Sequence, residues 1–162
     1  MTEPASTPLH RNVARVVDAG RELGISVEPV KFPEGTKTAA DAAAAIGCDV
    51  GQIVKSLIFA VDGEVVLAYV SGANQLDEVK LASAAGGVRC GRVDADAVRA
   101  ATGFPIGGVP PFGFTTQIRV FIDPDLLQYD EIWAAAGHPA AVFSSTFAEL
   151  QQMTGADDLE ME

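Results

Sequence analysis

The sequence holds few of the residues that build metal sites or disulfide scaffolds: two cysteines and two histidines among 162 residues. Cys48 and Cys90 lie far apart and form no Cys-x-x-Cys pair, and neither His10 nor His138 stands at ligand spacing from a cysteine. The composition therefore predicts no bound metal, no cofactor, and two small buried thiols in a reducing compartment.

Long apolar runs and a secretion signal are also missing. The longest apolar stretches reach about nine residues, well short of the ~20 that a membrane-spanning helix needs. The segment Met1 to Pro4 has neither the basic nor the apolar region of a signal peptide. We therefore expect no membrane association and a cytoplasmic location.

What is present fits one globular domain. Hydrophobic residues make up 48% and charged residues 20% of the chain, which excludes disorder over most of its length. No repeat or linker divides it, so we expect a single domain over residues 1–154 and an acidic tail over 155–162 that frays into solvent. The formal net charge of −11 counts by itself against a polyanionic partner.

Hydrophobic spacing and turn residues predict an α+β fold with a mixed sheet. Two β-rich runs on either side of Asp62-Gly63 predict strands from Ile53 to Val61 and from Glu64 to Val70, joined by a tight turn. Helices are expected at 9–24, 38–46, 76–86, 94–102 and from 145 or 146 onward, and short strands at 25–30, 117–123, 131–136 and 140–143. Because helices and strands do not alternate strictly, a doubly wound parallel sheet is disfavoured.

Lys55 is the first catalytic candidate. It lies in the strand Ile53 to Val61, whose two faces are both otherwise mainly apolar, and burying an ammonium without a partner is costly. Two interpretations stay open: Lys55 extends its head to solvent, or it is held in a cleft to bind phosphate or polarise a carbonyl.

The segment Gly103 to Gly113 is the second unusual feature, with four glycines and three prolines in eleven residues. Glycine allows a ligand to approach the backbone closely, and proline restricts the conformational freedom of the backbone. N–H groups could therefore be held in advance as hydrogen-bond donors. The segment lacks the Gly-Lys-Ser/Thr ending of a phosphate loop. A rigid connection that binds nothing is the alternative.

Three further residues are weaker candidates. His138 is a possible acid or base because imidazole exchanges protons near neutral pH, although a lone histidine is more often structural. Ser71 and Gly72, where the hairpin ends, form either a polar binding loop or a simple turn. No Ser-His-Asp or Gly-x-Ser-x-Gly arrangement is present, which weakens a serine-hydrolase interpretation.

These features in this order resemble one family, the YbaK/ProX aminoacyl-tRNA deacylases, which are related to the editing domain inserted in bacterial prolyl-tRNA synthetases. The resemblance runs from about Val27 to Leu150. Its pieces are Thr38-Ala-x-x-Ala-Ala, Ile53-Val54-Lys55-Ser56-Leu57-Ile58-Phe59, Leu67-Ala-x-Val-Ser-Gly, Leu76-Asp-x-x-Lys80-Leu81-Ala82, Thr102 to Gly113, and Val120-Phe-Ile-Asp-x-x-Leu126. The lysine in the first hairpin strand, together with the loop from Gly107 to Pro111, is the specific pair.

The resemblance implies hydrolysis of the ester between a wrong amino acid and the 3′-terminal adenosine of a tRNA, typically tRNA for proline carrying Cys or Ala. It also implies a mixed, partly closed sheet surrounded by helices. Lys55 matches the essential lysine of the family, and the loop matches a wall of N–H groups around the aminoacyl carbonyl. The expected substrate-binding residues are Ser56, Ser71, Gly72, Gly107, Gly108, Val109, Pro110 and Pro111, with Lys55 and His138 as catalytic residues.

Departures from the family pattern leave the edited amino acid open. Ser56 stands where alanine-type members have Asn, no Asn follows His138-Pro139, and residues 131–136 lack the hydroxyl residue of cysteinyl-type members. The expected partner is the 3′ end of tRNA, held weakly and transiently, with prolyl-tRNA synthetase or an elongation factor lending selectivity. Two alternatives remain: a non-catalytic binding or adaptor protein, and a hydrolase of another acyl or nucleotide ester.

Overall fold

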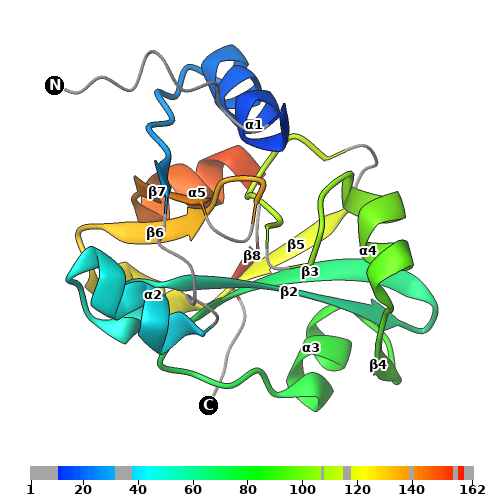
Figure 1. Cartoon of the computed structure of the whole chain (residues 1–162). Coiled ribbons are helices and arrows are strands. Elements are labelled where there is room, and N and C mark those ends of the chain that lie inside the picture. Colours follow the sequence, from blue (N-terminus) through cyan, green and yellow to red (C-terminus); the bar gives the residue numbers. More distant parts are fainter. Residues whose placement is uncertain are drawn as a thin grey trace, which may run out of the picture.

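The computed structural model describes residues 11–31, 38–106, 108–114, 118–138, 141–154 and 157–158, and confirms the predicted α+β class (Figure 1). The helices are α1 (Arg11–Glu22), α2 (Ala39–Ile46), α3 (Glu78–Ala84), α4 (Ala95–Thr102) and α5 (Phe147–Thr154), with short 3-10 helices η2 (Val50–Gln52) and η3 (Pro124–Gln128). The strands are β1 (Val30–Lys31), β2 (Val54–Val61), β3 (Glu64–Ser71), β4 (Cys90–Arg92), β5 (Arg119–Ile122), β6 (Ile132–Ala135), β7 (Ala141–Ser145) and β8 (Asp157–Asp158).

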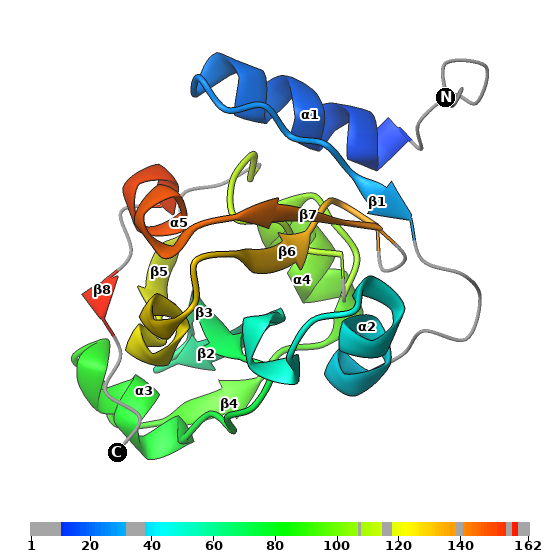
Figure 2. The same ribbon diagram turned by 90° about the vertical axis from the view of Figure 1, so that its left-hand side faces the viewer.

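The strands form two sheets. The five-stranded sheet has the order β4-β2-β3-β5-β8 and is mixed, because β2 pairs antiparallel with both β3 and β4 whereas β3–β5 and β5–β8 are parallel. The three-stranded sheet has the order β1-β7-β6, and the two sheets meet at a bridge between Ile53 and Trp133 without closing into a barrel. The three-stranded sheet and α1 lie on one side of the larger sheet, and α3 lies on the other (Figure 2).

Alternate residues of β2 and β3 face two separate cores. Leu67 and Tyr69 join the larger core, with residues from α1, α4, α5, β6 and β7. Val66, Ala68 and Val70 join the smaller core, which includes α3. Since Ser56 is paired with Tyr69 and Lys55 with Val70, these sequence neighbours lie on opposite faces of the sheet.

The predicted hairpin turn is confirmed, and polar side chains cap two of the predicted helices. Asp62 and Gly63 both have positive φ angles, 51° and 88°, as a two-residue hairpin turn requires. Thr38 caps α2 through a reciprocal capping box with Asp41, and Asp94 caps α4.

Three sequence predictions need correction. The strand expected at 25–30 is reduced to β1, Val30–Lys31. The cysteines are each partly exposed and not buried. Part of the acidic tail does not fray: Asp157 and Asp158 pair with Phe121 and Ile122 at the edge of the larger sheet.

None of the helices in the described part of the chain is long and apolar enough to span a bilayer.

Candidate active site

Two hydroxyl groups fix the glycine- and proline-rich loop to the larger sheet. Ser56 Oγ donates to the Val109 carbonyl at 2.8 Å, and the Tyr69 hydroxyl donates to the Pro110 carbonyl at 2.8 Å. Complete burial raises the pKa of Tyr69 well above its ordinary value, so the phenol stays protonated as a donor. Because the residues from Gly108 to Pro111 are themselves buried, the loop is a fixed wall and not a flexible connection.

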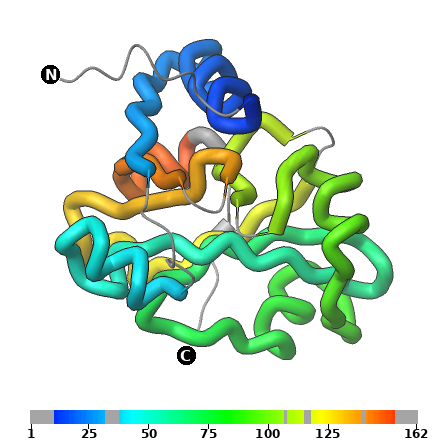
Figure 3. Tube along the Cα trace, viewed as in Figure 1, coloured from blue at the N-terminus to red at the C-terminus, as the bar shows by residue number. Residues whose placement is uncertain are grey.

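The loop also packs directly on the turn that carries His138. A Cβ added to Gly108 would lie 2.9 Å from the His138 nitrogen and 3.0 Å from the Gly137 carbonyl carbon. Figure 3 shows the segment after α4 running beside α1 before it returns to the sheet, and Arg15 of α1 donates to the Gly103 carbonyl at 3.0 Å. The structure therefore brings the predicted loop and the half-buried His138 together.

The loop offers fewer N–H groups to a ligand than the resemblance implies. Pro110 and Pro111 have no N–H, and the Gly108 N–H donates to the Pro105 carbonyl at 3.0 Å. Gly107 lies outside the described residues. Within the part of the chain that the structure describes, no acceptor is paired with the Val109 N–H, so it is the loop donor that remains for a ligand.

Lys55 lies on the α3 side of β2, where its ammonium donates to the main-chain carbonyl of Asn74. Burial lowers the pKa of Lys55, and the nearby Asp123 carboxylate partly opposes this by raising it. No ion pair joins Lys55 to a described carboxylate. An ammonium has three donors, and this one uses a single neutral acceptor, so a carbonyl or phosphate oxygen can still bind it.

Ser71 and Gly72 hold the turn that carries Asn74. Ser71 is 1% exposed, and its hydroxyl donates to the Gly51 carbonyl at 2.7 Å. A Cβ on Gly72 would lie 2.4 Å from the Val50 carbonyl oxygen. The Ser71 hydroxyl is thus used within the protein, as is the Gly72 N–H, which donates to the Ile53 carbonyl at 2.7 Å.

A cavity of about 330 Å³ opens where Ser56 and Val109 meet. The rest of its lining is mainly apolar and comprises Leu57, Ile58, Phe59, Arg92, Val93, Val98 and Ile106. Strand β4 pairs with β2 only from Phe59 to Val61, so the preceding part of this β2 edge has no strand partner in the described chain. We identify this cavity as the candidate substrate pocket.

The register of the hairpin directs a second N–H group to that edge. Val61 and Glu64 close the two-residue turn as a hydrogen-bonded pair, and such pairs recur at every second residue of an antiparallel ladder. Counting back from Val61, Ser56 falls at a position that is not hydrogen-bonded to β3. The N–H and C=O of Ser56 therefore point away from β3. Together with the Val109 N–H, the Ser56 N–H makes two main-chain donors around one pocket.

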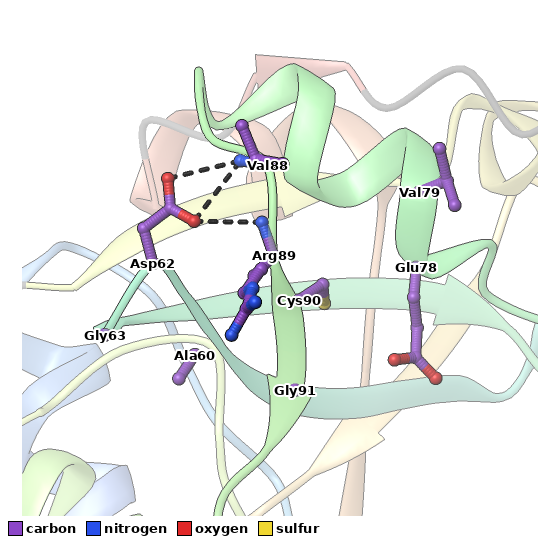
Figure 4. A pocket seen from close by; sticks show the side chains of 9 residues that line it. All are labelled: Ala60, Asp62, Gly63, Glu78, Val79, Val88, Arg89, Cys90 and Gly91. Atoms are coloured by element: carbon purple, nitrogen blue, oxygen red, sulfur yellow. Dashed lines mark hydrogen bonds between the residues drawn. The ribbon is translucent and has the colours of Figure 1, made fainter.

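A larger cavity of about 680 Å³ lies beside α3 and β4 and contains none of the predicted site residues (Figure 4). On its wall the Asp62 carboxylate accepts from the N–H groups of Val88 and Arg89, which fixes the chain before β4. Among the described residues, no group of three or more His, Cys, Asp or Glu could hold a metal ion.

Sequence reasoning missed two residues of the site, Tyr69 and Asp123. Tyr69 reads as an ordinary strand residue, although a tyrosine buried on a strand needs an acceptor for its hydroxyl. The sequence indicates Arg92 only as one of several arginines near 94–102, because the strand β4 that brings it to the pocket was not predicted. The hydrogen bond from the Asn74 amide to Asp123 joins segments 49 residues apart, and no local sequence pattern predicts such a contact.

The fold and the site together define the class of protein: an α+β domain with a mixed sheet, in which two main-chain N–H donors lie at a small pocket that can bind or transform a ligand. Its family follows from comparison: the model of the aminoacyl-tRNA editing domain matches residues 33–153. The chain therefore belongs to the aminoacyl-tRNA editing domain family, as the resemblance predicted.

Similar proteins agree with this assignment. A solved structure described as a proposed trans-editing enzyme for prolyl tRNA synthetase shares 42% identity with a TM-score of 0.90, over 96% of this chain and 99% of that one. A proline–tRNA ligase of Maridesulfovibrio salexigens is 34% identical over 113 residues, which is 70% of this chain but 19% of the ligase. An uncharacterized protein, YwhH of Bacillus subtilis, is 27% identical over 76% of this chain and 79% of its own.

Proposed function

We propose that the protein is a trans-editing hydrolase that cleaves the ester between a wrong amino acid and the 3′-terminal adenosine of a tRNA. Cys and Ala on tRNA for proline are the expected substrates. The observation that carries the proposal is the Ser56–Val109 hydrogen bond, because it holds the two main-chain donors at one pocket. The family and the trans-editing neighbour support the same chemistry.

In the proposed reaction the ester carbonyl oxygen accepts from the N–H groups of Val109 and Ser56. A water molecule attacks the carbonyl carbon, and the negative charge that develops on the oxygen is stabilised by these donors, each worth about 10²–10³ in rate. The intermediate then releases the ribose oxygen, which takes up a proton, and leaves the free amino acid. The nucleophile is water, so no side-chain nucleophile is needed. Lys55 extends from the opposite face of β2 and does not line this pocket, so its proposed role is to bind another carbonyl or phosphate oxygen of the aminoacyl-tRNA end.

The pocket fits one aminoacyl-adenosine end better than a longer segment of RNA. Its volume of about 330 Å³ is at the small end of ligand pockets, and its apolar walls suit an uncharged acyl group or base. Arg92 is the cationic group in this lining and is exposed, so it can meet a tRNA phosphate. The acidic chain would then hold tRNA weakly and mainly by its end, with prolyl-tRNA synthetase as a proposed partner.

Replacing Arg92 with glutamine should raise the KM for mischarged tRNA with kcat unchanged, because a phosphate contact binds ground and transition states alike. The slope of log(kcat/KM) against log[KCl] should fall by about 1. The control is Arg99→Gln, an exposed arginine of α4 that does not line the pocket. Identical KM values and salt slopes for the two variants would show that Arg92 does not contact the RNA.

The proposed function is tested with purified protein and a panel of tRNAs for proline charged with Cys, Ala or Pro. Hydrolysis of Cys- or Ala-tRNA that is much faster than that of Pro-tRNA supports the proposal. Absence of hydrolysis for every mischarged tRNA, with or without prolyl-tRNA synthetase, rejects it. In that case, retained binding of tRNA or of the synthetase would favour the adaptor alternative.

A further inference from the structure

Asp123 is a fully buried carboxylate, at 0% exposure, that the proposed reaction does not use. It follows β5, and its oxygens accept from the Ser71 N–H at 3.1 Å, the Asn74 side-chain amide at 2.8 Å and the Asp125 N–H at 2.9 Å. Three N–H donors satisfy the charge that burial would otherwise penalise.

Asn74 connects this carboxylate to Lys55. Its side-chain amide donates to both Asp123 and Asp125, at 2.8 Å each, while its main-chain carbonyl accepts from the Lys55 ammonium. One residue therefore separates the buried negative charge from the catalytic candidate. Capping of η3 explains the bond from Asp123 to Asp125, but it does not explain the bonds to Ser71 and Asn74.

The charges around Lys55 single out Asp123. Asp123 is the charged group that favours the protonated form of Lys55, against the larger effect of desolvation. The other charged groups on this face include Glu78 and Lys80 of α3, the helix that packs on it. Asp125 is exposed and bonds to the same Asn74 amide, so its charge is screened by water.

We propose that Asp123 is a positioning residue for the deacylation proposed above: through Asn74 it holds the Lys55 ammonium in place. The inference rests on the proposed function for its effect on activity. Its effect on Lys55 itself is independent of activity and can be measured separately.

The test compares Asp123→Asn with Asp125→Asn, which alters the other carboxylate on the Asn74 amide. The lysine side-chain resonances are titrated by NMR, with Lys55→Met identifying the Lys55 signal. Asp123→Asn should lower the pKa of Lys55 by about one unit, whereas Asp125→Asn should leave it close to that of the wild type. The alkaline limb of the kcat profile for deacylation should move to lower pH by the same amount, with KM unchanged.

Each outcome decides one question. An unchanged pKa of Lys55 in folded Asp123→Asn overturns the inference, whatever the activity. Should that variant not fold, Asn74→Ala replaces it: removing the bridging amide should lower kcat without raising KM, and wild-type kcat would overturn the inference. A wild-type protein that hydrolyses no mischarged tRNA rejects the proposed function, while the Lys55 titration still tests the link to Asp123.

Discussion

Replacing Lys55 with methionine is expected to reduce deacylation of mischarged tRNA by about 100-fold or more, an effect comparable to the loss of an oxyanion donor. Methionine keeps the length of the side chain and removes its charge and donors. The Asn74 carbonyl is a neutral acceptor, so it leaves the ammonium charge available to a carbonyl or phosphate oxygen of the substrate. Initial rates on Ala- and Cys-tRNA for proline, per folded protein, measure the loss.

The matched control is Lys80→Met on α3, which removes a lysine outside the site and should leave the rate unchanged. Stability separates a catalytic from a structural role for Lys55. Burial holds the pKa of Lys55 below its ordinary value of 10.5, so the unfolded chain binds more protons between the folded-state pKa and 10.5. Wild-type stability should therefore rise with pH in that window, a rise that Lys55→Met should lack.

A methionine variant that is less stable than wild type near neutral pH, and whose activity falls only in proportion to the folded fraction, would show Lys55 to be structural. Thermal melts at pH 7 and pH 10 provide this comparison. The fold itself should survive, because methionine removes the cost of desolvating an ammonium and β2 is otherwise apolar except for Ser56.

The sequence predicts the hairpin well because local rules decide it. Successive side chains of a strand point to opposite faces, and Asp62-Gly63 sets the register of β2 and β3, so the opposite orientations of Lys55 and Ser56 follow from spacing alone. Strand β4 has no such signal: it is three residues long with Gly91 at its centre. It forms because β2 offers it an edge, which is a tertiary effect.

The candidate site likewise has parts that local sequence patterns predict and parts that only tertiary packing determines. The loop and Lys55 stand out because glycine, proline and a lysine in an apolar strand are locally unusual. The partners that fix them are ordinary residues at distant positions: Tyr69 is 41 residues from Pro110, and Ser56 is 53 from Val109. Contacts of that separation depend on how the elements pack, which spacing in one sequence does not encode.

Replacing Gly108 with alanine should damage both the fold and the activity. The added Cβ would lie 2.9 Å from the His138 nitrogen and 3.0 Å from the His138 Cα, closer than real Cβ atoms approach backbone. One of the two loops must shift, at a cost of about 1–3 kcal/mol in the free energy of unfolding. A displaced Val109 N–H no longer meets the ester oxygen, so deacylation should fall by about 10- to 100-fold in the folded protein.

Gly91→Ala is the matched control, because nothing lies within 4 Å of a Cβ at that position of β4. It should leave stability and rate at wild-type values, so the difference between the variants isolates the contact at Gly108. Urea unfolding and deacylation rates on the same samples separate the two effects. If Gly108→Ala loses stability yet keeps full activity, the loop is a structural element, and the donors for the oxyanion must be sought elsewhere along the β2 edge.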